Sequence, residues 1–217
     1  MEYLKCPNCG ANVEDNAKFC SECGSTLYDN PVPKKKKRSS KRRFIILAII
    51  IVLGIVGKWQ YDIYNYGINL HNAAYYILSS SQHLENAGVL FVNVWNNTIF
   101  QIQDEETDRF TREGNGTGQF FSDFNDSLDL LTDDNAYLTE IRQAESDKIE
   151  VFDLMGKIKN PPRKYGEAYH NITTLYSNYM IFYNLVMSPN GNLTGYSDSF
   201  KNARDNLLQS YYTVSMY

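Results

Sequence analysis

The sequence predicts an all-α protein in which a single transmembrane helix leads into an extracellular bundle of about four helices, after a small cysteine-rich module at the N-terminus. Three observations support this prediction. Residues 44–57 contain no polar side chain, and eleven of the fourteen are Phe, Ile, Leu or Val. All four cysteines precede this run. The 160 residues behind it repeat apolar side chains at helical spacing and are numerous enough to bury one core.

The module at residues 1–29 contains two CxxC motifs, CPNC and CSEC, each followed by glycine. A CxxC turn places two sulfur atoms on one side of a tight loop, and the glycine permits the positive φ that the turn requires. Two such turns can close a tetrahedral, structural site around one Zn²⁺ ion. The four candidate metal ligands are Cys6, Cys9, Cys20 and Cys23.

Apolar side chains are scarce in this module, so a bound metal would have to supply most of its folding free energy. The candidates for a small core are Leu4, Val13, Phe19 and Leu27. Two other interpretations of the cysteines fit less well. A redox CxxC motif needs a βαβ context, which the sequence lacks. Two structural disulfides would not persist in a reducing cytoplasm. One structural Zn²⁺ is the predicted cofactor.

Residues 30–43 are predicted to form a basic, unstructured linker. Eight Lys or Arg lie between positions 34 and 43, among proline and serine. By itself such a run would suggest nuclear import or nucleic-acid binding, but beside an apolar run it indicates topology and contact with anionic lipid. The positive-inside rule places the N-terminus in the cytoplasm and the C-terminus outside the cell.

Residues 44–64 are predicted to form the transmembrane helix and its interfacial extension. The fourteen apolar residues rise only about 21 Å, against a hydrocarbon core of about 30 Å. Basic residues that extend their charged ends to the interface, and an aromatic belt, supply the missing length. These flanking residues are Arg42, Arg43, Lys58, Trp59, Tyr61 and Tyr64. A cleaved signal peptide fits poorly because 43 residues precede the run, and a soluble core helix would show a polar face.

The motifs CPNCG and FCSECG, followed by a basic linker and one span, resemble the zinc-ribbon membrane proteins of Gram-positive bacteria, which include teicoplanin-resistance-associated proteins. The resemblance covers about the first quarter of the chain and implies zinc ligation by the four cysteines. It implies no activity, because such ribbons precede many different exported domains. Residues 160–200 are similar in pattern to uncharacterised helical envelope proteins of the same bacteria.

Residues 65–217 are predicted to form the extracellular bundle. A row of large residues seven apart is followed, four residues later, by a row of small residues, which suits a helix that a neighbour approaches closely. The large row is Ile63, Leu70, Ile77, Leu84 and Phe91, and the small row is Gly67, Ala74, Ser81 and Gly88 before Trp95. No proline interrupts residues 44–105, so we expect the membrane helix to continue outward as one rod. The glycine-rich turn at residues 114–118 ends this region.

Three further helical stripes follow. The second helical region, residues 120–159, carries Phe124, Leu128, Leu131, Leu138, Ile141, Ile149, Phe152 and Met155, with residues 132–135 as a candidate cap for a fresh start. The third begins near Pro162 and carries Tyr165, Tyr169, Ile172, Tyr176, Tyr179, Tyr183 and Val186. The fourth follows the turn at residues 188–191 and carries Tyr196, Phe200, Ala203, Leu207 and Tyr211. The tyrosines are interpreted as a half-buried core whose hydroxyls reach solvent.

The sequence shows no catalytic constellation, and we expect no enzyme. The three histidines, His71, His83 and His170, are isolated, and no cysteine lies beyond the span. One ExxH motif, Glu167 to His170, lacks the second copy and the two further glutamates of di-metal bundles, which favours a surface pair. Acidic turns such as Asp133–Asp134 are interpreted as solvated.

Charge is distributed unevenly along the chain: residues 1–43 carry a net +5, and residues 58–217 a net −9. The acidic outer part argues against nucleic acid as a partner. The function hypothesis is a single-pass cell-membrane protein whose exported domain binds a protein partner and whose ribbon contacts another. The alternative is a sensor that binds a small ligand or wall fragment and signals through the continuous helix. A homodimer through the small-residue row stays open.

Overall fold

The computed structural model describes residues 3–27 and 40–214. Most of the predicted linker, residues 30–39, lies outside this part of the chain. The chain divides into two compact units, Met1–Gly54 and Ile55–Tyr217. The predicted domain boundaries at residues 43 and 64 stay predictions.

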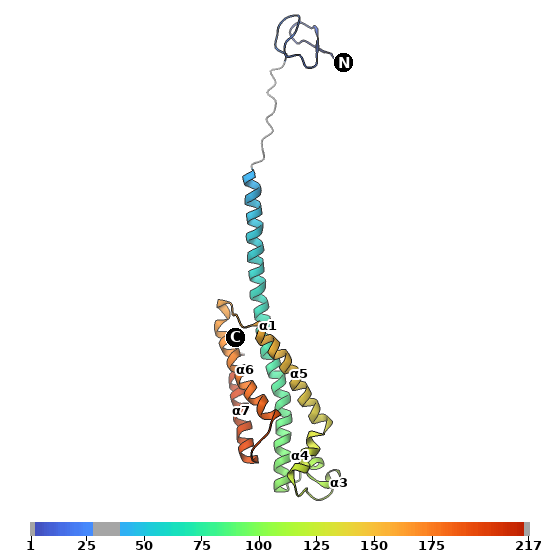
Figure 1. The fold of residues 1–217 in the computed structure, drawn as a ribbon, viewed down its shortest axis with the longest axis vertical. Coiled ribbons are helices and arrows are strands. Elements are labelled where there is room, and N and C mark those ends of the chain that lie inside the picture. Colours follow the sequence, from blue (N-terminus) through green and yellow to red (C-terminus); the bar gives the residue numbers. More distant parts are fainter. Residues whose placement is uncertain (1–2, 28–39, 215–217) are drawn as a thin grey trace. The chain divides into compact units, whose positions relative to one another are not determined.

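The longest element is α1, Ser40–Phe100, an uninterrupted helix of 61 residues (Figure 1). The expectation of one continuous rod is therefore confirmed to Phe100. Between residues 44 and 56 every large apolar side chain exposes 46% to 67% of its surface. Among the described helices, α1 alone is long and apolar enough to cross a membrane.

The later part of α1 turns one face into the core of the second unit. Ile77 and Leu84 are fully buried and Phe91 nearly so, which confirms the row of large residues. The small row lies beside it, and Gly88 is where a neighbour comes closest: a Cβ atom there would lie 2.2 Å from the ring of Phe200. The small side chain is needed for this contact, as the sequence pattern predicted.

Helix α1 ends at Phe100, earlier than the predicted turn at residues 114–118. Gln101 adopts a left-handed conformation with φ of 50°, and the N–H of Ile102 donates to the carbonyl of Asn97 at 3.0 Å. This six-to-one hydrogen bond is the Schellman ending of a helix. Glutamine seldom adopts this conformation, so no clear stop signal is visible in the sequence. Two short helices follow, α2 (Asp108–Thr111) and α3 (Glu113–Gly116).

The second helical region is two helices, α4 (Phe124–Thr132) and α5 (Asn135–Lys157). The predicted start of a new helix within this region is confirmed, because the Asp134 carboxylate accepts hydrogen bonds from the first free N–H groups of α5, at 2.9 and 3.1 Å. The predicted stripe is wrong at two positions in the later part of α5, although Met155 packs against the core as predicted. Ile149 and Phe152 are 70% and 72% exposed. The buried residues of α5 are Tyr137, Ala144, Asp147, Val151 and Leu154.

The last two long helices are α6 (Gly166–Met187), preceded by the 3-10 turn η1 (Arg163–Tyr165), and α7 (Leu193–Val214). Together with α5 they lie alongside the later part of α1 and bury one hydrophobic core with it (Figure 1). On α7 the predicted stripe is confirmed from Tyr196 to Leu207. An aromatic cluster joins α1, α4 and α7, in which Trp95 stacks on Phe124 with ring centroids 5.6 Å apart.

The tyrosine stripe of α6 differs from the prediction at its centre. Tyr179 is fully buried, and its hydroxyl lies 2.8 Å from the hydroxyl of Ser80 on α1 instead of reaching solvent. The Ser80 hydroxyl in turn donates to the carbonyl of Ala144 on α5 at 3.0 Å. Three helices therefore share one buried polar contact, which satisfies groups that would be costly to bury unpaired.

Replacing Gly88 with alanine is expected to destabilise the helical unit, because the new methyl group would overlap the buried ring of Phe200. Overpacking costs about 1–3 kcal/mol, partly offset by the better helix propensity of alanine, about 1 kcal/mol. The matched control is Gly156→Ala on α5, where a Cβ atom meets nothing within 4 Å. Urea unfolding followed by circular dichroism should show a loss for G88A and no loss for G156A. Equal stability of both variants would contradict the close contact.

The buried tyrosines predict a loss of stability in alkali. Burial raises the pKa of Tyr66 from 10.0 to about 12 and also raises those of Tyr179 and Tyr196. The unfolded chain therefore loses these protons first, so stability is complete below pH 10 and falls as the pH rises towards 12. The urea midpoint should fall over this window, and Tyr66→Phe should weaken the dependence. Tyr75→Phe, at a position 59% exposed, should leave it unchanged.

Candidate metal centre

The cysteine module is built on a two-stranded antiparallel sheet of β1 (Tyr3–Lys5) and β2 (Asn12–Glu14), in which Leu4 pairs with Val13. The first CxxC turn connects these strands. Each strand is only three residues long, which is too short to be predicted from the sequence pattern. The sheet places Cys6 directly after β1.

The two CxxC turns have the same backbone geometry. In the first, the N–H of Gly10 donates to the carbonyl of Cys6 at 2.9 Å, and in the second, the N–H of Gly24 donates to that of Cys20 at 2.8 Å. Both glycines have positive φ, 75° and 70°, as the sequence predicted. A side chain at either position would strain the turn, so each glycine fixes how its two cysteines are presented.

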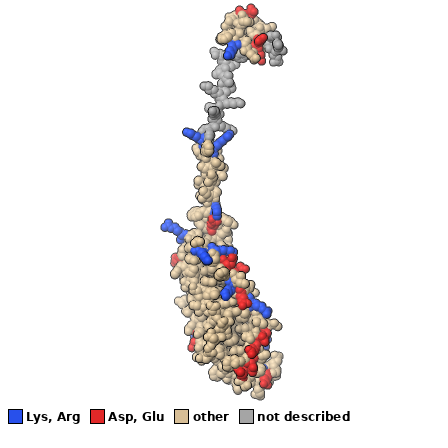
Figure 2. Space-filling view, viewed as in Figure 1, with Lys and Arg blue, Asp and Glu red and all other residues tan. Residues whose placement is uncertain are grey.

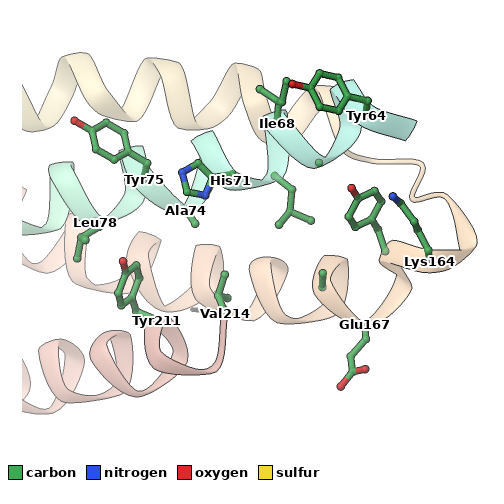
Figure 3. A pocket seen from close by; sticks show the side chains of 14 residues that line it. Tyr64, Ile68, His71, Ala74, Tyr75, Leu78, Lys164, Glu167, Tyr211 and Val214 are labelled. Carbon is green, nitrogen blue, oxygen red and sulfur yellow. The ribbon is translucent and has the colours of Figure 1, made fainter. Parts of the chain in front are cut away.

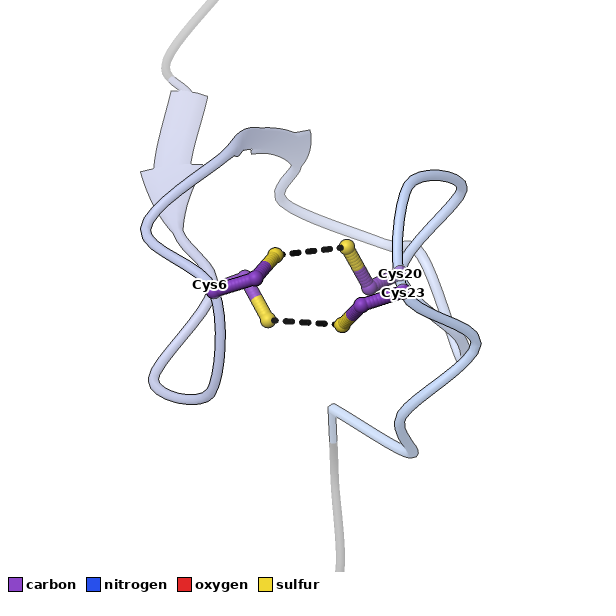
Figure 4. A group of neighbouring side chains, drawn as sticks. Cys6, Cys20 and Cys23 are labelled. Atoms are coloured by element: carbon purple, nitrogen blue, oxygen red, sulfur yellow. Dashed lines mark hydrogen bonds between the residues drawn. The ribbon is translucent and has the colours of Figure 1, made fainter.

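The four sulfur atoms converge between the turns (Figure 4). All lie within 4.8 Å of one another, with Cys6 Sγ 3.8 Å from Cys23 Sγ and Cys9 Sγ 3.6 Å from Cys20 Sγ. A tetrahedral zinc ion with Zn–S bonds of about 2.3 Å requires sulfur separations of about 3.8 Å. Disulfide bonds would bring the sulfurs to about 2.05 Å, and the four cysteines are free. The arrangement fits one structural zinc ion.

Ser25 is a contact of this centre that the sequence analysis missed. Its hydroxyl lies 3.1 Å from Cys23 Sγ and 3.4 Å from Cys6 Sγ. Together with the backbone N–H of Asn8, it lowers the pKa of the Cys6 thiol to about 6, and it also lowers that of Cys23. Donors of this kind favour the thiolate form that a metal needs. A serine one residue after a CxxCG motif was the available signal.

The hydrogen bonds of Cys9 act differently on its thiol. The backbone N–H of Ala11 lowers the pKa of Cys9, but contacts with the Cys23 and Cys20 sulfurs and burial outweigh this effect and raise it to about 12. The thiols of Cys6 and Cys9 therefore do not ionise together. A divalent metal at the centre of the four sulfurs would remove this conflict by stabilising all four thiolates.

The apolar core of the module is smaller than expected. Val13 is buried, with Cys6 and Cys20 beside it, but Leu4 and Phe19 are 46% and 61% exposed. Leu27 packs against this cluster and is partly buried. Little apolar surface is thus removed from water, which strengthens the expectation that a bound metal supplies the folding free energy.

The prediction that all three histidines are isolated is wrong for one of them. His83 on α1 is not isolated, because its Nδ1 atom lies 2.6 Å from the Glu140 carboxylate on α5. The pair joins two helices at a partly exposed position. Glu167 and His170 are both exposed, as expected for a surface pair. Within the described residues the four cysteines form the only group of three or more His, Cys, Asp or Glu side chains close enough to hold a metal.

Comparison with known proteins identifies one region. The zinc-ribbon domain family matches residues 5–27, which include both CxxC turns. Neither the curated proteins nor the solved structures contain a match to the chain. The match supports the interpretation of the sulfur cluster as a structural zinc site, and it covers no part of the helices.

Proposed function

We propose that this chain is a non-enzymatic, single-pass membrane protein whose zinc ribbon lies in the cytoplasm and whose helical unit is exported to bind a protein partner at the cell envelope. In this proposal Cys6, Cys9, Cys20 and Cys23 ligate one Zn²⁺ ion. A site closed by four thiolates leaves no open coordination position, so the metal would stabilise the ribbon rather than act on a substrate.

The observation that carries the proposal is the exposed apolar part of α1. Residues 44–57 of this helix carry no charged or polar side chain, and none of them is buried. Figure 2 shows basic side chains at the start of α1, followed along the helix by an uncharged stretch. The described basic residues are Lys41, Arg42 and Arg43. Apolar surface of this extent would be unfavourable in water and is favourable in a lipid bilayer.

Surface features of the helical unit support a binding role. On α5, Ile149 and Phe152 are three residues apart and largely exposed, so they share one face of the helix. Ile181 on α6 is 60% exposed. Exposed apolar side chains that adjoin one another and are surrounded by polar residues mark protein-contact sites. We therefore place the protein-binding surface on α5.

The topology is tested by labelling with a membrane-impermeant maleimide. All native cysteines precede residue 24, so a cysteine introduced at the exposed Lys201 of α7 reports on the helical unit alone. Intact cells should label Lys201→Cys and leave the unaltered chain unlabelled. Labelling of Lys201→Cys only after permeabilisation would contradict an exported helical unit.

The adaptor and the sensor are separated by photo-cross-linking from Ile149, Phe152 and Ile181. A discrete protein adduct from these positions supports the adaptor, and adducts to wall polymer alone support the sensor. Inserting two glycines after Lys58 gives a second criterion, because a sensor requires a rigid helix there. The insertion should preserve a protein adduct if the chain is an adaptor.

A further inference from the structure

A cavity of about 790 Å³ lies in the helical unit, close to where α1 enters it (Figure 3). It is bounded by α1, by Lys164, Tyr165 and the start of α6, and by the end of α7. Its lining is mainly apolar or aromatic, including Tyr64, Ile68, Leu78, Tyr211 and Val214. The volume falls within the range of about 300–1,000 Å³ that is usual for sites of small ligands.

One wall of the cavity is fixed by specific contacts. The ring of Tyr165 stacks on that of Tyr66, with centroids 5.1 Å apart, and the Tyr66 hydroxyl donates to the carbonyl of Ile158 at 2.8 Å. Tyr165 reaches this position because residue 67 is glycine: a Cβ atom there would lie 2.3 Å from the Tyr165 hydroxyl. The connection between α5 and α6 is therefore held against α1 beside the cavity.

Lys164 and Glu167 both line this end of the cavity, within residues 159–167, which carry three basic side chains and one acidic one. The amino group of Lys164 lies 4.5 Å from the centre of the Tyr165 ring. Arg163 and Lys159 are exposed nearby in sequence, and neither forms an ion pair with another described residue. In Figure 3 the carboxylate of Glu167 points away from the other labelled side chains. The excess of basic over acidic residues would attract an anionic group to this end of the cavity.

The position along α1 indicates where such an anionic group would come from. A transmembrane helix needs about 20 residues, so a span that starts at residue 44 reaches about residue 63. The cavity begins at Tyr64, and Tyr165 contacts α1 at Tyr66 and Gly67. Lys164 would then lie at the depth of the lipid headgroups, and the apolar lining would extend from there away from the bilayer.

We propose that this cavity binds one anionic phospholipid of the membrane, with its phosphate beside Lys164 and Arg163 and one acyl chain along the apolar lining towards Leu78. The proposal rests on the proposed function, because it requires residues 44–63 to span the bilayer. An acyl chain gains little by moving from lipid to an apolar cavity. The headgroup contacts therefore decide the binding, and anionic lipids are preferred over zwitterionic ones.

The test uses the full chain in phosphatidylcholine nanodiscs that contain a trace of phosphatidylglycerol with a photoreactive acyl chain. After irradiation, adducts are located by peptide mass spectrometry. We expect adducts within residues 64–78 and 211–214, and fewer with photoreactive phosphatidylcholine. The double variant R163Q/K164Q should lower capture of phosphatidylglycerol by more than about tenfold, at roughly fivefold for each charge. The remote variant K201Q is the matched control and should leave it unchanged.

A second variant, Ala74→Trp, places a large ring inside the cavity and should strongly reduce these adducts while those within residues 44–63 persist. Equal capture of both lipids, or adducts confined to residues 44–63, would overturn the lipid site and leave the span intact. Absence of adducts in residues 44–63 would overturn the span itself. A chain that ends at Val214 and captures lipid when the complete chain captures none would also overturn the proposal, because the chain's own C-terminus would then be the occupant.

Discussion

Replacing Cys20 with serine is expected to abolish stoichiometric zinc binding and to unfold the ribbon. Cys20 is buried, and its sulfur lies 3.6 Å from that of Cys9. Structural zinc contributes about 10–16 kcal/mol of binding free energy, which in such small modules is folding free energy. The few buried apolar side chains of the ribbon cannot replace it. Metal analysis of the purified full chain should find one zinc per native chain and almost none in C20S.

The matched control for this prediction is Ser21→Ala, which changes an exposed residue inside the same CxxC turn. It should retain one zinc and the protease resistance of the ribbon. Helix content should be the same in both variants, because the α-helices of residues 55–214 form a compact unit of their own. A C20S chain that keeps one zinc would refute the four-cysteine site.

Replacing Phe182 with alanine is expected to cost about 3–5 kcal/mol of unfolding free energy, the largest loss we predict for the helical unit. Phe182 is fully buried on α6, and its ring centroid lies 5.3 Å from that of Phe200 on α7. The deletion removes apolar contacts and leaves a cavity that the surrounding helices cannot fill. Since domains are stable by only about 5–15 kcal/mol, much of the unit should unfold in mild denaturant.

Phe152→Ala on α5 provides the matched control, because it removes the same side chain from a position 72% exposed. Its cost should stay within about 0.5 kcal/mol. Urea unfolding of the full chain in a mild detergent, followed by far-UV circular dichroism, measures both variants. Similar losses for F152A and F182A would mean that the face of α5 assigned to solvent is buried.

The parts of the protein that the sequence predicted well depend on residues close together in the chain. Each CxxC turn closes within five residues, so the spacing of Cys6 and Cys9 and the glycine behind them determine how the sulfurs are presented. The exposed apolar run of α1 and its uninterrupted course to Phe100 likewise follow from local composition. The cap of α5 was visible because aspartate side chains bond the free N–H groups of the next few residues.

Other features depended on which elements come together in space. The stripe of α5 passes through Asp147 and Val151 because α1 and α6 approach that side, and the apolar character of Phe152 could not reveal it. The end of α1 depends on a left-handed glutamine, for which the backbone had to be seen. Ser25 reaches the sulfurs only once the two turns face each other.

The sequence by itself therefore determined the metal ligands' spacing, the apolar segment and the helical nature of the rest. Only the tertiary structure decided which helix faces are buried. It also decided that the Tyr179 hydroxyl forms a hydrogen bond with Ser80 instead of water, and that the Tyr165 side chain packs against Gly67 beside a cavity. The physical reason is that turn and helix formation depend on neighbours within about one or two turns of chain, whereas burial depends on residues up to about a hundred positions away.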